Sequence, residues 1–281
     1  MDFIAFITTL YFSFANNSLH AILTRFKSIS TFTHKDDKQV ISESTKPCTL
    51  ILVAAGRGKR FGGPLPKQYQ SVADRPIIQW TIQHLHQHPL IKTILPVISP
   101  NDQGLWQEFA DPDHRFAKLA EPVIGGEQRQ HSVFNGLHKL REGLQKEDWV
   151  AIHDGVRPFV SSALLNTLLE ARDHHNAMIP AVTLSDTIKE IDSNHTIVNT
   201  PDRAKLRAVQ TPQLFQFGQI YSAHQHAMRD HFIGTDDASL MERMGQPVHI
   251  VPGDPQNIKI TQPMDRYIAQ RLLAPNEGDV E

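Results

Sequence analysis

One short segment constrains the fold more than any other. Residues 49–55 (TLILVAA) are apolar at every position after Thr49, and they lead straight into residues 56–63 (GRGKRFGG), a loop with four glycines. An apolar run of this length that ends at a turn is typical of a strand buried on both faces of a parallel sheet. Parallel strands need long crossover connections, usually helices, so this segment predicts an α/β protein.

The chain that follows repeats the alternation of short apolar runs with segments of helical spacing. We expect strands within residues 93–99, 149–160, 177–184 and 249–260, and helices within 76–91, 133–144 and 164–175. Such an alternation implies βαβ units with right-handed crossovers. The fold class predicted is therefore a doubly wound, Rossmann-like α/β sheet.

One stretch departs from this rhythm. Residues 187–200 and 206–215 are β-like runs beside polar turns, and Ser193-Asn194 marks one tip. Two such runs around a turn indicate a hairpin. We expect a β-arm at about residues 186–210 that projects from the sheet and contacts a partner subunit.

The first 46 residues differ from the rest of the chain. Their apolar run, residues 3–15, is shorter than the roughly 20 residues of a membrane span, and only Met1 and Asp2 precede it, without the positive charge of a secretory signal. We interpret residues 1–46 as a disordered or non-functional leader and linker, residues 47–275 as the folded domain and residues 276–281 as a tail. A transit peptide for a plastid-type organelle and a weak membrane-associating helix are the alternatives.

Charge and cysteine content exclude several classes of partner. The 28 Lys and Arg residues nearly balance the 30 Asp and Glu residues, for a formal net charge of −2. No global basic field attracts nucleic acid, so an anionic ligand needs a local cluster of bases. Cys48 is the single cysteine, which excludes an internal disulfide and a cysteine-ligated zinc site. The composition favours a reducing compartment, and we expect the cytoplasm.

The glycine-rich loop lacks the two common nucleotide-binding motifs. Phe61 stands where the dinucleotide motif G-x-G-x-x-G needs its third glycine. Pro64 and Leu65 follow Gly58–Gly63, where a P-loop carries Lys and then Ser or Thr. Neither a dinucleotide fold nor a P-loop is therefore indicated.

The same loop is nevertheless strongly basic. Four bases fall within 11 residues without an acid: Arg57, Lys59, Arg60 and Lys67. In open α/β sheets, loops at the carboxyl ends of strands bind ligands, and glycines let backbone amides approach an anion. This pattern predicts a polyphosphate cradle; a solvated basic turn is the structural alternative.

Three further clusters follow expected strands or precede expected helices: residues 125–132 (GGEQRQHS), 153–158 (HDGVRP) and 257–261 (NIKIT). The first could bind an anion or read a base edge at a helix start, or be an ordinary capped loop. In the second, Asp154 could hold Mg²⁺ or a ribose hydroxyl and Arg157 a phosphate, or the two could pair with each other. The third ends the last expected strand, which puts Lys259 and Thr261 on one face, and Lys259 is either a phosphate ligand or a surface lysine.

Two enzyme classes lack their sequence signatures. The 16 histidines include no H-E-x-x-H motif, and of His84, His86 and His88 only the outer pair shares a helix face. No G-x-S-x-G motif of a serine hydrolase occurs.

Taken together, the clusters resemble the 2-C-methyl-D-erythritol 4-phosphate cytidylyltransferase family of the non-mevalonate isoprenoid pathway. The similarity covers seven collinear blocks between about Thr49 and Arg271: LVAAGRGKRFGGPLPKQY, GGEQRQHSV, HDGVRPFV, VTLSDTIK, TPDRAKLRAVQTPQLF, GTDDASLMERMG and QNIKITQPMD. The resemblance implies a nucleotidyltransferase-type fold. It also implies attack of a sugar-alcohol phosphate on the α-phosphate of CTP, with release of pyrophosphate. Mg²⁺ or another divalent cation is the implied cofactor.

The resemblance also implies roles for individual residues. Those matching the catalytic positions are Arg60, Lys67 and Lys259. Those matching the CTP-binding positions are Ala54, Ala55, Gly56, Gly126, Glu127, Ser132 and Asp154, and Asp154 also matches the position near the metal. Those matching the acceptor-binding positions are Arg157, Thr187, Arg203, Thr211, Thr235 and Thr261.

A homodimer with exchanged arms is implied as well. Thr187 and Arg203 lie on the arm, so each site would take part of its acceptor pocket from the partner. Neither nucleic acid nor stable membrane insertion is expected.

The sequence departs from the family pattern at three places: Glu127 stands where Asp is frequent, Gly155-Val156 where two alanines are frequent, and Asp237 where Glu is frequent. Two alternatives stay open. A ribitol-5-phosphate cytidylyltransferase would share the cradle and differ in the alcohol, and a catalytically silent dimeric nucleotide-binding protein would share only the fold.

Overall fold

The computed structural model describes residues 45–58 and 61–273, and an eight-stranded sheet lies at its centre. The strands are β1 (Cys48–Ala54), β4 (Ile91–Ile98), β5 (Val123–Ile124), β6 (Trp149–Asp154), β7 (Ala177–Thr183), β10 (Arg207–Val209), β11 (Gln213–Gln216) and β12 (His249–Pro252). Their order is β10-β7-β11-β6-β1-β4-β5, and β12 pairs with β7. Of the segments expected for the leader and tail, residues 1–44 and 276–281 lie outside the described residues.

The sheet is mostly parallel, which confirms the predicted α/β class. β1 pairs in parallel with both β4 and β6, β4 with β5, and β12 with β7. β11 is one exception, because it lies antiparallel between β6 and β7. β10, which falls in the expected arm region, also joins this sheet, antiparallel to β7.

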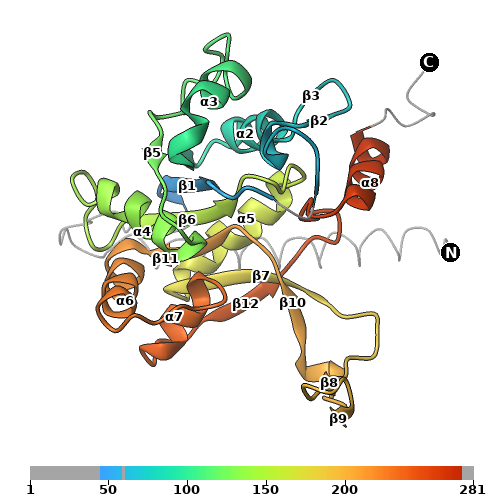
Figure 1. Cartoon of the computed structure of the whole chain (residues 1–281). Coiled ribbons are helices and arrows are strands. Elements are labelled where there is room, and N and C mark those ends of the chain that lie inside the picture. Colours follow the sequence, from blue (N-terminus) through green and yellow to red (C-terminus); the bar gives the residue numbers. More distant parts are fainter. Residues whose placement is uncertain (1–44, 59–60, 274–281) are drawn as a thin grey trace, which may run out of the picture. The chain divides into compact units, whose positions relative to one another are not determined.

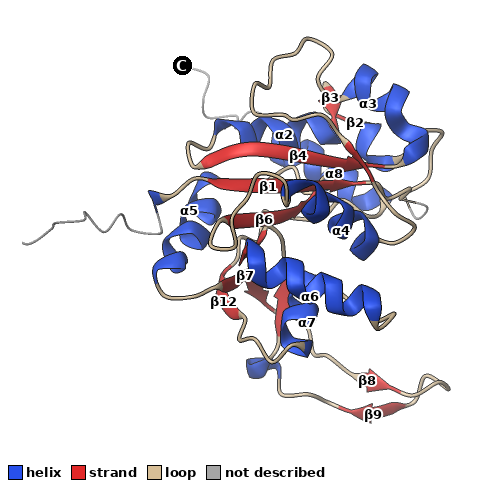
Figure 2. Cartoon of the chain, turned by 90° about the vertical axis from the view of Figure 1, so that its left-hand side faces the viewer, coloured by secondary structure: helices blue, strands red, loops and turns tan. Residues whose placement is uncertain are grey.

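Helices cover both faces of the sheet (Figures 1 and 2). They are α2 (Ile77–Gln87), α3 (Gln103–Phe109), α4 (Arg129–Leu140), α5 (Ser162–Glu170), α6 (Phe217–Arg229), α7 (Asp237–Arg243) and α8 (Pro263–Leu273). Leu50 and Leu52 of β1 pack in a buried cluster with α2 and α5, whereas Ile51 packs in another with α4, α6 and α7. This alternation follows from the two-residue period of a strand and explains why β1 is apolar throughout.

Short elements connect these layers. They are η2 (Lys67–Tyr69), β2 (Ser71–Val72), β3 (Arg75–Pro76), η3 (Pro100–Asp102), η4 (Ala171–Asp173) and η5 (Arg203–Lys205). β2 and β3 pair antiparallel directly before α2. None of the helices in the described ranges has both the length and the apolar character needed to cross a membrane.

A β-hairpin projects from the sheet, as the sequence predicts (Figures 1 and 2). Its strands are β8 (Glu190–Ile191) and β9 (Ile197–Asn199), and they pair only with each other. Residues 189–200 are all exposed. The projecting part is shorter than the expected residues 186–210, because β10 joins the main sheet; from here on, the arm means residues 189–200.

The expectation that Lys259 and Thr261 end a strand is wrong. β12 stops at Pro252, and residues 257–261 form a loop that docks on the turn after β6, where the Ile260 amide donates to the Val156 carbonyl at 2.9 Å. Pro255 and the Asp254–Asn257 turn break the strand pattern before Lys259.

Candidate active site

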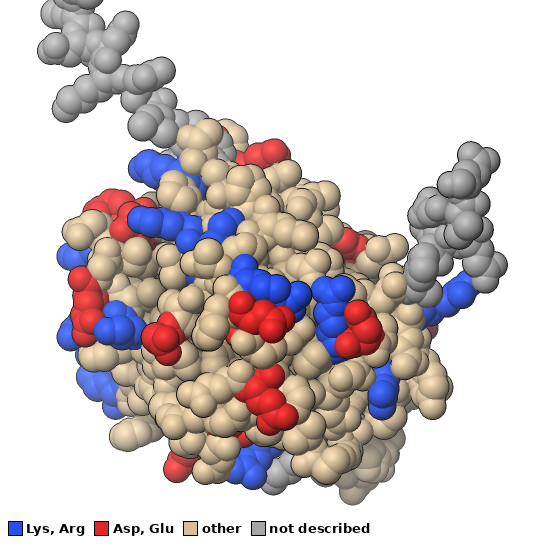
Figure 3. All heavy atoms as spheres, turned by 90° about the horizontal axis from the view of Figure 1, so that it is seen from above, with Lys and Arg blue, Asp and Glu red and all other residues tan. Residues whose placement is uncertain are grey.

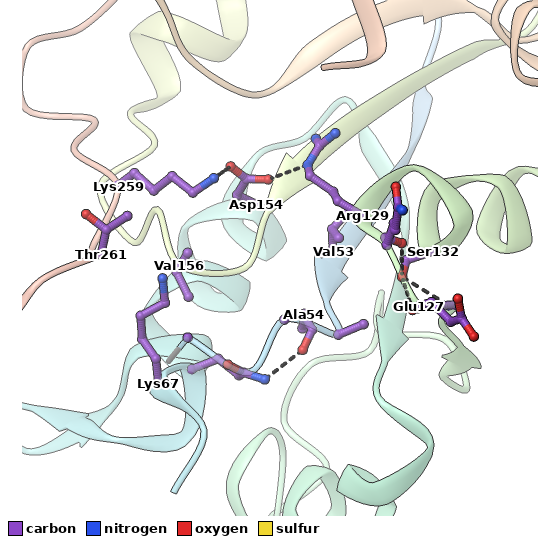
Figure 4. A pocket seen from close by; sticks show the side chains of 16 residues that line it. Val53, Ala54, Lys67, Glu127, Arg129, Ser132, Asp154, Val156, Lys259 and Thr261 are labelled. Carbon is purple, nitrogen blue, oxygen red and sulfur yellow. Dashed lines mark hydrogen bonds and ion pairs between the residues drawn. The ribbon is translucent and has the colours of Figure 1, made fainter. Parts of the chain in front are cut away.

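A cavity of about 270 Å³ lies where the carboxyl ends of β1 and β6 meet the start of α4. This is the edge of the sheet at which ligands bind in open α/β folds. Figure 4 shows the side chains that line it. The lining residues are Val53, Ala54, Ala55, Gly56, Gly58, Lys67, Gln68, Gly126, Glu127, Gln128, Arg129, Ser132, Asp154, Val156, Lys259 and Thr261.

The glycine-rich loop begins at the end of β1 and brings Lys67 to the cavity. Gly58 has a φ of +58°, and a Cβ at this position would lie 2.7 Å from the Lys67 Cβ. Glycine is therefore required both for the turn and for the close approach of Lys67. The Lys67 side chain comes from η2 and is largely buried, at 8% exposure.

Two glutamines beside Lys67 hold this loop in place. Gln68 Nε2 donates to the Ala54 carbonyl at 2.7 Å. Gln70 Nε2 donates to the carbonyls of Gly62 at 2.6 Å and Leu65 at 2.8 Å. One 3-10 turn therefore fixes both the beginning and the end of the loop.

A second loop, residues 125–128, enters the cavity from the start of α4. The Gly126 amide donates to Ser132 Oγ at 3.1 Å, and this hydroxyl in turn donates to the Gln128 carbonyl at 3.1 Å. A Cβ on Gly126 would lie 2.5 Å from the Cβ of His131, so the loop needs glycine here. Glu127 lies on the tip of this tight loop and is exposed.

Asp154, the last residue of β6, is the electrostatic centre of the site. Lys259 Nζ lies 2.8 Å from its Oδ2, Arg129 Nε lies 3.1 Å from its Oδ1, and Arg157 Nε lies 3.8 Å from Oδ2. Burial raises the pKa of this carboxyl, but the charges of Arg129 and Lys259 outweigh that effect and hold the pKa well below its usual range. Asp154 is therefore ionised at neutral pH.

The structure brings most of the expected nucleotide and catalytic positions into this one cavity. Arg60 lies outside the described residues. The positions that line the cavity are Ala54, Ala55, Gly56, Lys67, Gly126, Glu127, Ser132, Asp154, Lys259 and Thr261.

The other expected acceptor positions do not line it. Arg157 reaches Asp154 but directs Nη1 to the Asn257 carbonyl at 2.8 Å. Thr211 is buried, where its hydroxyl accepts from the Asp154 amide at 3.1 Å and contacts His153 Nδ1 at 3.0 Å. Thr187, Arg203 and Thr235 are exposed in this chain.

Two of the lining residues to which the sequence gives no role, Gln68 and Arg129, make side-chain hydrogen bonds that hold the site. Gln68 holds the end of β1, and Arg129 joins Asp154 to Asp237, which lies 108 residues further along the chain. Arg129 lies inside the block GGEQRQHSV, but no local pattern indicates its partners, since both lie on other elements.

Two carboxylates line the cavity, those of Glu127 and Asp154, and Asp154 is the one at the position expected near the metal. Asp154 is ionised, but both of its oxygens already contact cationic side chains. No group of three or more His, Cys, Asp or Glu residues within the described ranges could hold a metal ion. The donor set fits a cation that takes most of its ligands from the phosphates of a nucleotide, as Mg²⁺ commonly does.

Solved structures of known proteins share this fold. The chain superimposes on 4-diphosphocytidyl-2C-methyl-D-erythritol synthase from Anaerococcus prevotii with a TM-score of 0.70 and 30% sequence identity. The superposition covers 81% of this chain and 96% of the synthase. For the 2-C-methyl-D-erythritol 4-phosphate cytidylyltransferase of Francisella tularensis the TM-score is 0.69 at 30% identity, over 81% and 100% of the two chains. Fold and site together define a nucleotidyltransferase.

The sequence comparisons give the family. The protein-family model described as IspD, 2-C-methyl-D-erythritol 4-phosphate cytidylyltransferase, matches residues 48–275 of this chain. The enzyme of that name from Geobacillus thermodenitrificans is 41% identical over 224 residues, which are 80% of this chain and 96% of the relative. The enzyme of the same name from Syntrophus aciditrophicus is 40% identical over 236 residues, which are 84% of this chain and 100% of the relative. The chain belongs to the 2-C-methyl-D-erythritol 4-phosphate cytidylyltransferase family.

Proposed function

We propose that this enzyme transfers the cytidylyl group of CTP to 2-C-methyl-D-erythritol 4-phosphate. The products are 4-diphosphocytidyl-2-C-methyl-D-erythritol and pyrophosphate, and the reaction belongs to non-mevalonate isoprenoid precursor synthesis. Family membership over residues 48–275 supports the activity. The observation that carries it is the convergence of Lys67, Lys259 and the two glycine loops on one cavity.

The reaction needs positioning and charge stabilisation more than covalent chemistry. The acceptor phosphate is already an anion, and its attack on the α-phosphate concentrates negative charge at that atom. We assign Lys67 and Arg60 to stabilise this charge, and Lys259 to assist them. Backbone amides of residues 54–56 are suited to bind the triphosphate, because two alanines and a glycine leave room for an anion to approach the backbone.

The loop of residues 125–128, together with Ser132 of α4, is assigned to the cytosine. Its carbonyls and amides lie at the start of α4, and Ser132 ties the loop closed through Gly126. A loop held this tightly accepts a pyrimidine by the size and the polar edge of the base.

Asp154 is the residue assigned to hold the divalent cation, together with the triphosphate. When bound, Mg²⁺ would neutralise charge on the departing pyrophosphate. Lys259 and Arg129 each contact one Asp154 oxygen, so a bound cation would compete with these two positive side chains for the carboxylate. Lys259 is the group suited to move, since its side chain is 39% exposed and has a flexible stem.

We further propose that the enzyme works as a homodimer in the cytoplasm. The arm carries exposed apolar side chains, including Ile191, Ile197 and Val198. Thr187 and Arg203, assigned to the acceptor, flank the arm and lie away from this chain's own cavity lining. A partner's arm would bring them to the site. The single, buried Cys48 suits a reducing compartment.

The test is pyrophosphate release by the purified full-length protein with CTP and Mg²⁺. Two acceptors, 2-C-methyl-D-erythritol 4-phosphate and ribitol 5-phosphate, are compared in parallel, with a reaction lacking acceptor as the background. Release with the first acceptor alone is the expected result. Pyrophosphate release with ribitol 5-phosphate alone would show that ribitol 5-phosphate is the acceptor. No release with either, from folded protein, would favour a nucleotide-binding protein without catalytic activity.

A further inference from the structure

Two buried titratable side chains lie directly behind the cavity and have no role in the transfer reaction. Asp237 is the first residue of α7 and is 1% exposed, and His224 on α6 is fully buried. Neither lines the cavity. A buried carboxylate is costly unless it is paired, so its partners indicate its role.

The partners form a continuous line of contacts into the cavity. His224 Nε2 lies 3.2 Å from Asp237 Oδ1, and Arg129 Nη1 donates to Asp237 Oδ2 at 2.8 Å. Arg129 Nε donates to Asp154 Oδ1 at 3.1 Å, and Lys259 Nζ lies 2.8 Å from Asp154 Oδ2. Figure 4 shows the last part of this line, from Arg129 through Asp154 to Lys259.

Arg129 is the link between the buried carboxylate and the catalytic one. A guanidinium is planar and holds its donors in fixed directions, so it can bridge two carboxylates in one orientation. With Nη1 fixed on Asp237, Nε is directed to Asp154. The plane of Arg129 on the cavity wall is therefore set by a residue outside the cavity.

The position of Asp237 is itself fixed by the start of α7. Asp236 caps this helix by accepting from the Ser239 amide at 3.0 Å. Gln213 of β11 donates to Asp236 Oδ2 at 2.7 Å and accepts from the Ala238 amide at 3.2 Å. These contacts anchor both neighbours of Asp237 to the central sheet.

The charge of Asp237 is maintained despite its burial. Burial raises the pKa of this carboxyl, but Arg129 and the hydrogen bond from His224 together hold it below its usual range. His224 Nδ1 has no hydrogen-bond partner among the described residues, so Asp237 is the group that orients its ring. The carboxylate therefore stays available to Arg129 at neutral pH.

We propose that Asp237 is a positioning residue for CTP binding, acting through Arg129 on Asp154 and the adjoining cavity wall. His224 supports it by holding the second carboxylate oxygen. This inference rests on the proposed function, because it takes CTP as the ligand of the cavity. It adds two residues on α6 and α7 to a site otherwise built from β1, η2, β6, α4 and the loop of residues 257–261.

The test measures CTP affinity by calorimetry, with Asp237→Asn in two backgrounds. In the otherwise unchanged protein we expect CTP to bind about tenfold more weakly, a typical coupling within one charge network. In the Arg129→Met background we expect Asp237→Asn to cause no further loss, because its effect passes through Arg129. Asp230→Asn is the matched control, since Asp230 also pairs with two arginines, Arg229 and Arg243, but on the surface.

If Asp237 only supported the fold, Asp237→Asn would lower thermal stability, and its effect on CTP affinity would be the same with Arg129 and with Met at position 129. Equal losses in both backgrounds, or full affinity in folded Asp237→Asn, would overturn the inference. If Asp237→Asn does not fold, His224→Leu replaces it; we expect about threefold weaker binding that disappears in the Arg129→Met background. Failure of the unchanged protein to bind CTP would instead overturn the proposed function.

Discussion

At the scale of single residues, the chemistry of the site depends on where a few charged groups are held. Lys67 reaches the cavity because Gly58, at positive φ, leaves room for its side chain. Lys259 reaches it because Ile260 fastens its loop to the turn after β6. In both cases an apolar or backbone contact one or more residues away sets the position of the charge.

Lys67→Ala should abolish most turnover while leaving the fold intact. The lost group stabilises charge that grows only in the transition state, so we expect kcat to fall by about 10²–10³. Steady-state pyrophosphate release gives kcat, and circular dichroism checks folding. Lys92→Ala, an exposed lysine on β4 that does not line the cavity, is the control. Near-normal turnover of Lys67→Ala would contradict the assignment.

His153, directly before Asp154, should make stability depend on pH. Its ring is fully buried, with Nε2 3.1 Å from the Arg157 carbonyl and Nδ1 3.0 Å from the Thr211 hydroxyl. Burial lowers its pKa from 6.5 to about 4, although the charge of Asp154 opposes this. The neutral ring therefore stabilises the fold fully above pH 6.5, and this contribution is lost as the pH falls toward 4.

The expected loss over this pH range is about 3 kcal/mol in the free energy of unfolding. Urea unfolding at several pH values measures it, for the unchanged protein and for His153→Gln. The variant lacks the titrating ring, so the difference between the two proteins should shrink as the pH falls from 6.5 to 4. Parallel curves over this range would show that His153 is not buried in its neutral form.

At the scale of elements, the η2 turn organises the cradle. Gln68 donates to a carbonyl before the glycine loop, and Gln70 donates to two carbonyls at its end. Lys67, directly before Gln68, enters the cavity. η2 and the residue that follows it therefore couple the shape of the loop to the position of a catalytic group.

Removal of the Gln70 amide should loosen the loop without unfolding the protein. Gln70→Ala loses both bonds to the carbonyls of Gly62 and Leu65, and we expect KM for CTP to rise about fivefold, the effect of roughly one net hydrogen bond. The exposed Gln256→Ala is the control. A Gln70→Ala enzyme with unchanged KM but a lower melting temperature would show that the contact supports only the fold.

Sequence patterns predict the elements that form through local signals. The apolar run of β1, its glycine loop and the helical spacing of α2 and α5 all have such signals, and the structure has these elements. The β-like run of residues 206–215 covers β10 and most of β11, but it does not show that β11 lies antiparallel between β6 and β7, because that position depends on contacts with those two strands. The loop of residues 257–261 resembles a strand in composition, and only its tertiary contact with Val156 shows otherwise.

The same distinction applies to the candidate site. Glycine loops and basic clusters are visible along the chain, and ten expected residues line one cavity. The network of Arg129, Asp237 and His224 is not visible, since its contacts join residues on three different helices. Contacts between side chains far apart in sequence leave no periodic or local signature to read.

At the scale of the whole molecule, charge and apolar surface are distributed differently. Acidic and basic side chains are interspersed over the face shown in Figure 3, in keeping with the balanced charge of the chain. Exposed apolar side chains, by contrast, recur on the arm: Ile191 is 50% exposed, and Ile197 and Val198 are each 58% exposed. Such a surface on a projecting hairpin favours burial against another chain.

Substitution of apolar residues on the arm should therefore both separate the subunits and reduce activity. We expect Ile197→Glu combined with Val198→Glu to convert a dimer to a monomer in analytical ultracentrifugation, because two charges would enter an apolar contact. Turnover should fall at least about tenfold, since each site would lose the partner's share of its acceptor pocket. Ile250→Glu, at a 53% exposed residue on β12, is the control. A monomeric arm variant with full turnover would show that one chain forms the complete site, and an arm variant that stays dimeric would place the interface elsewhere.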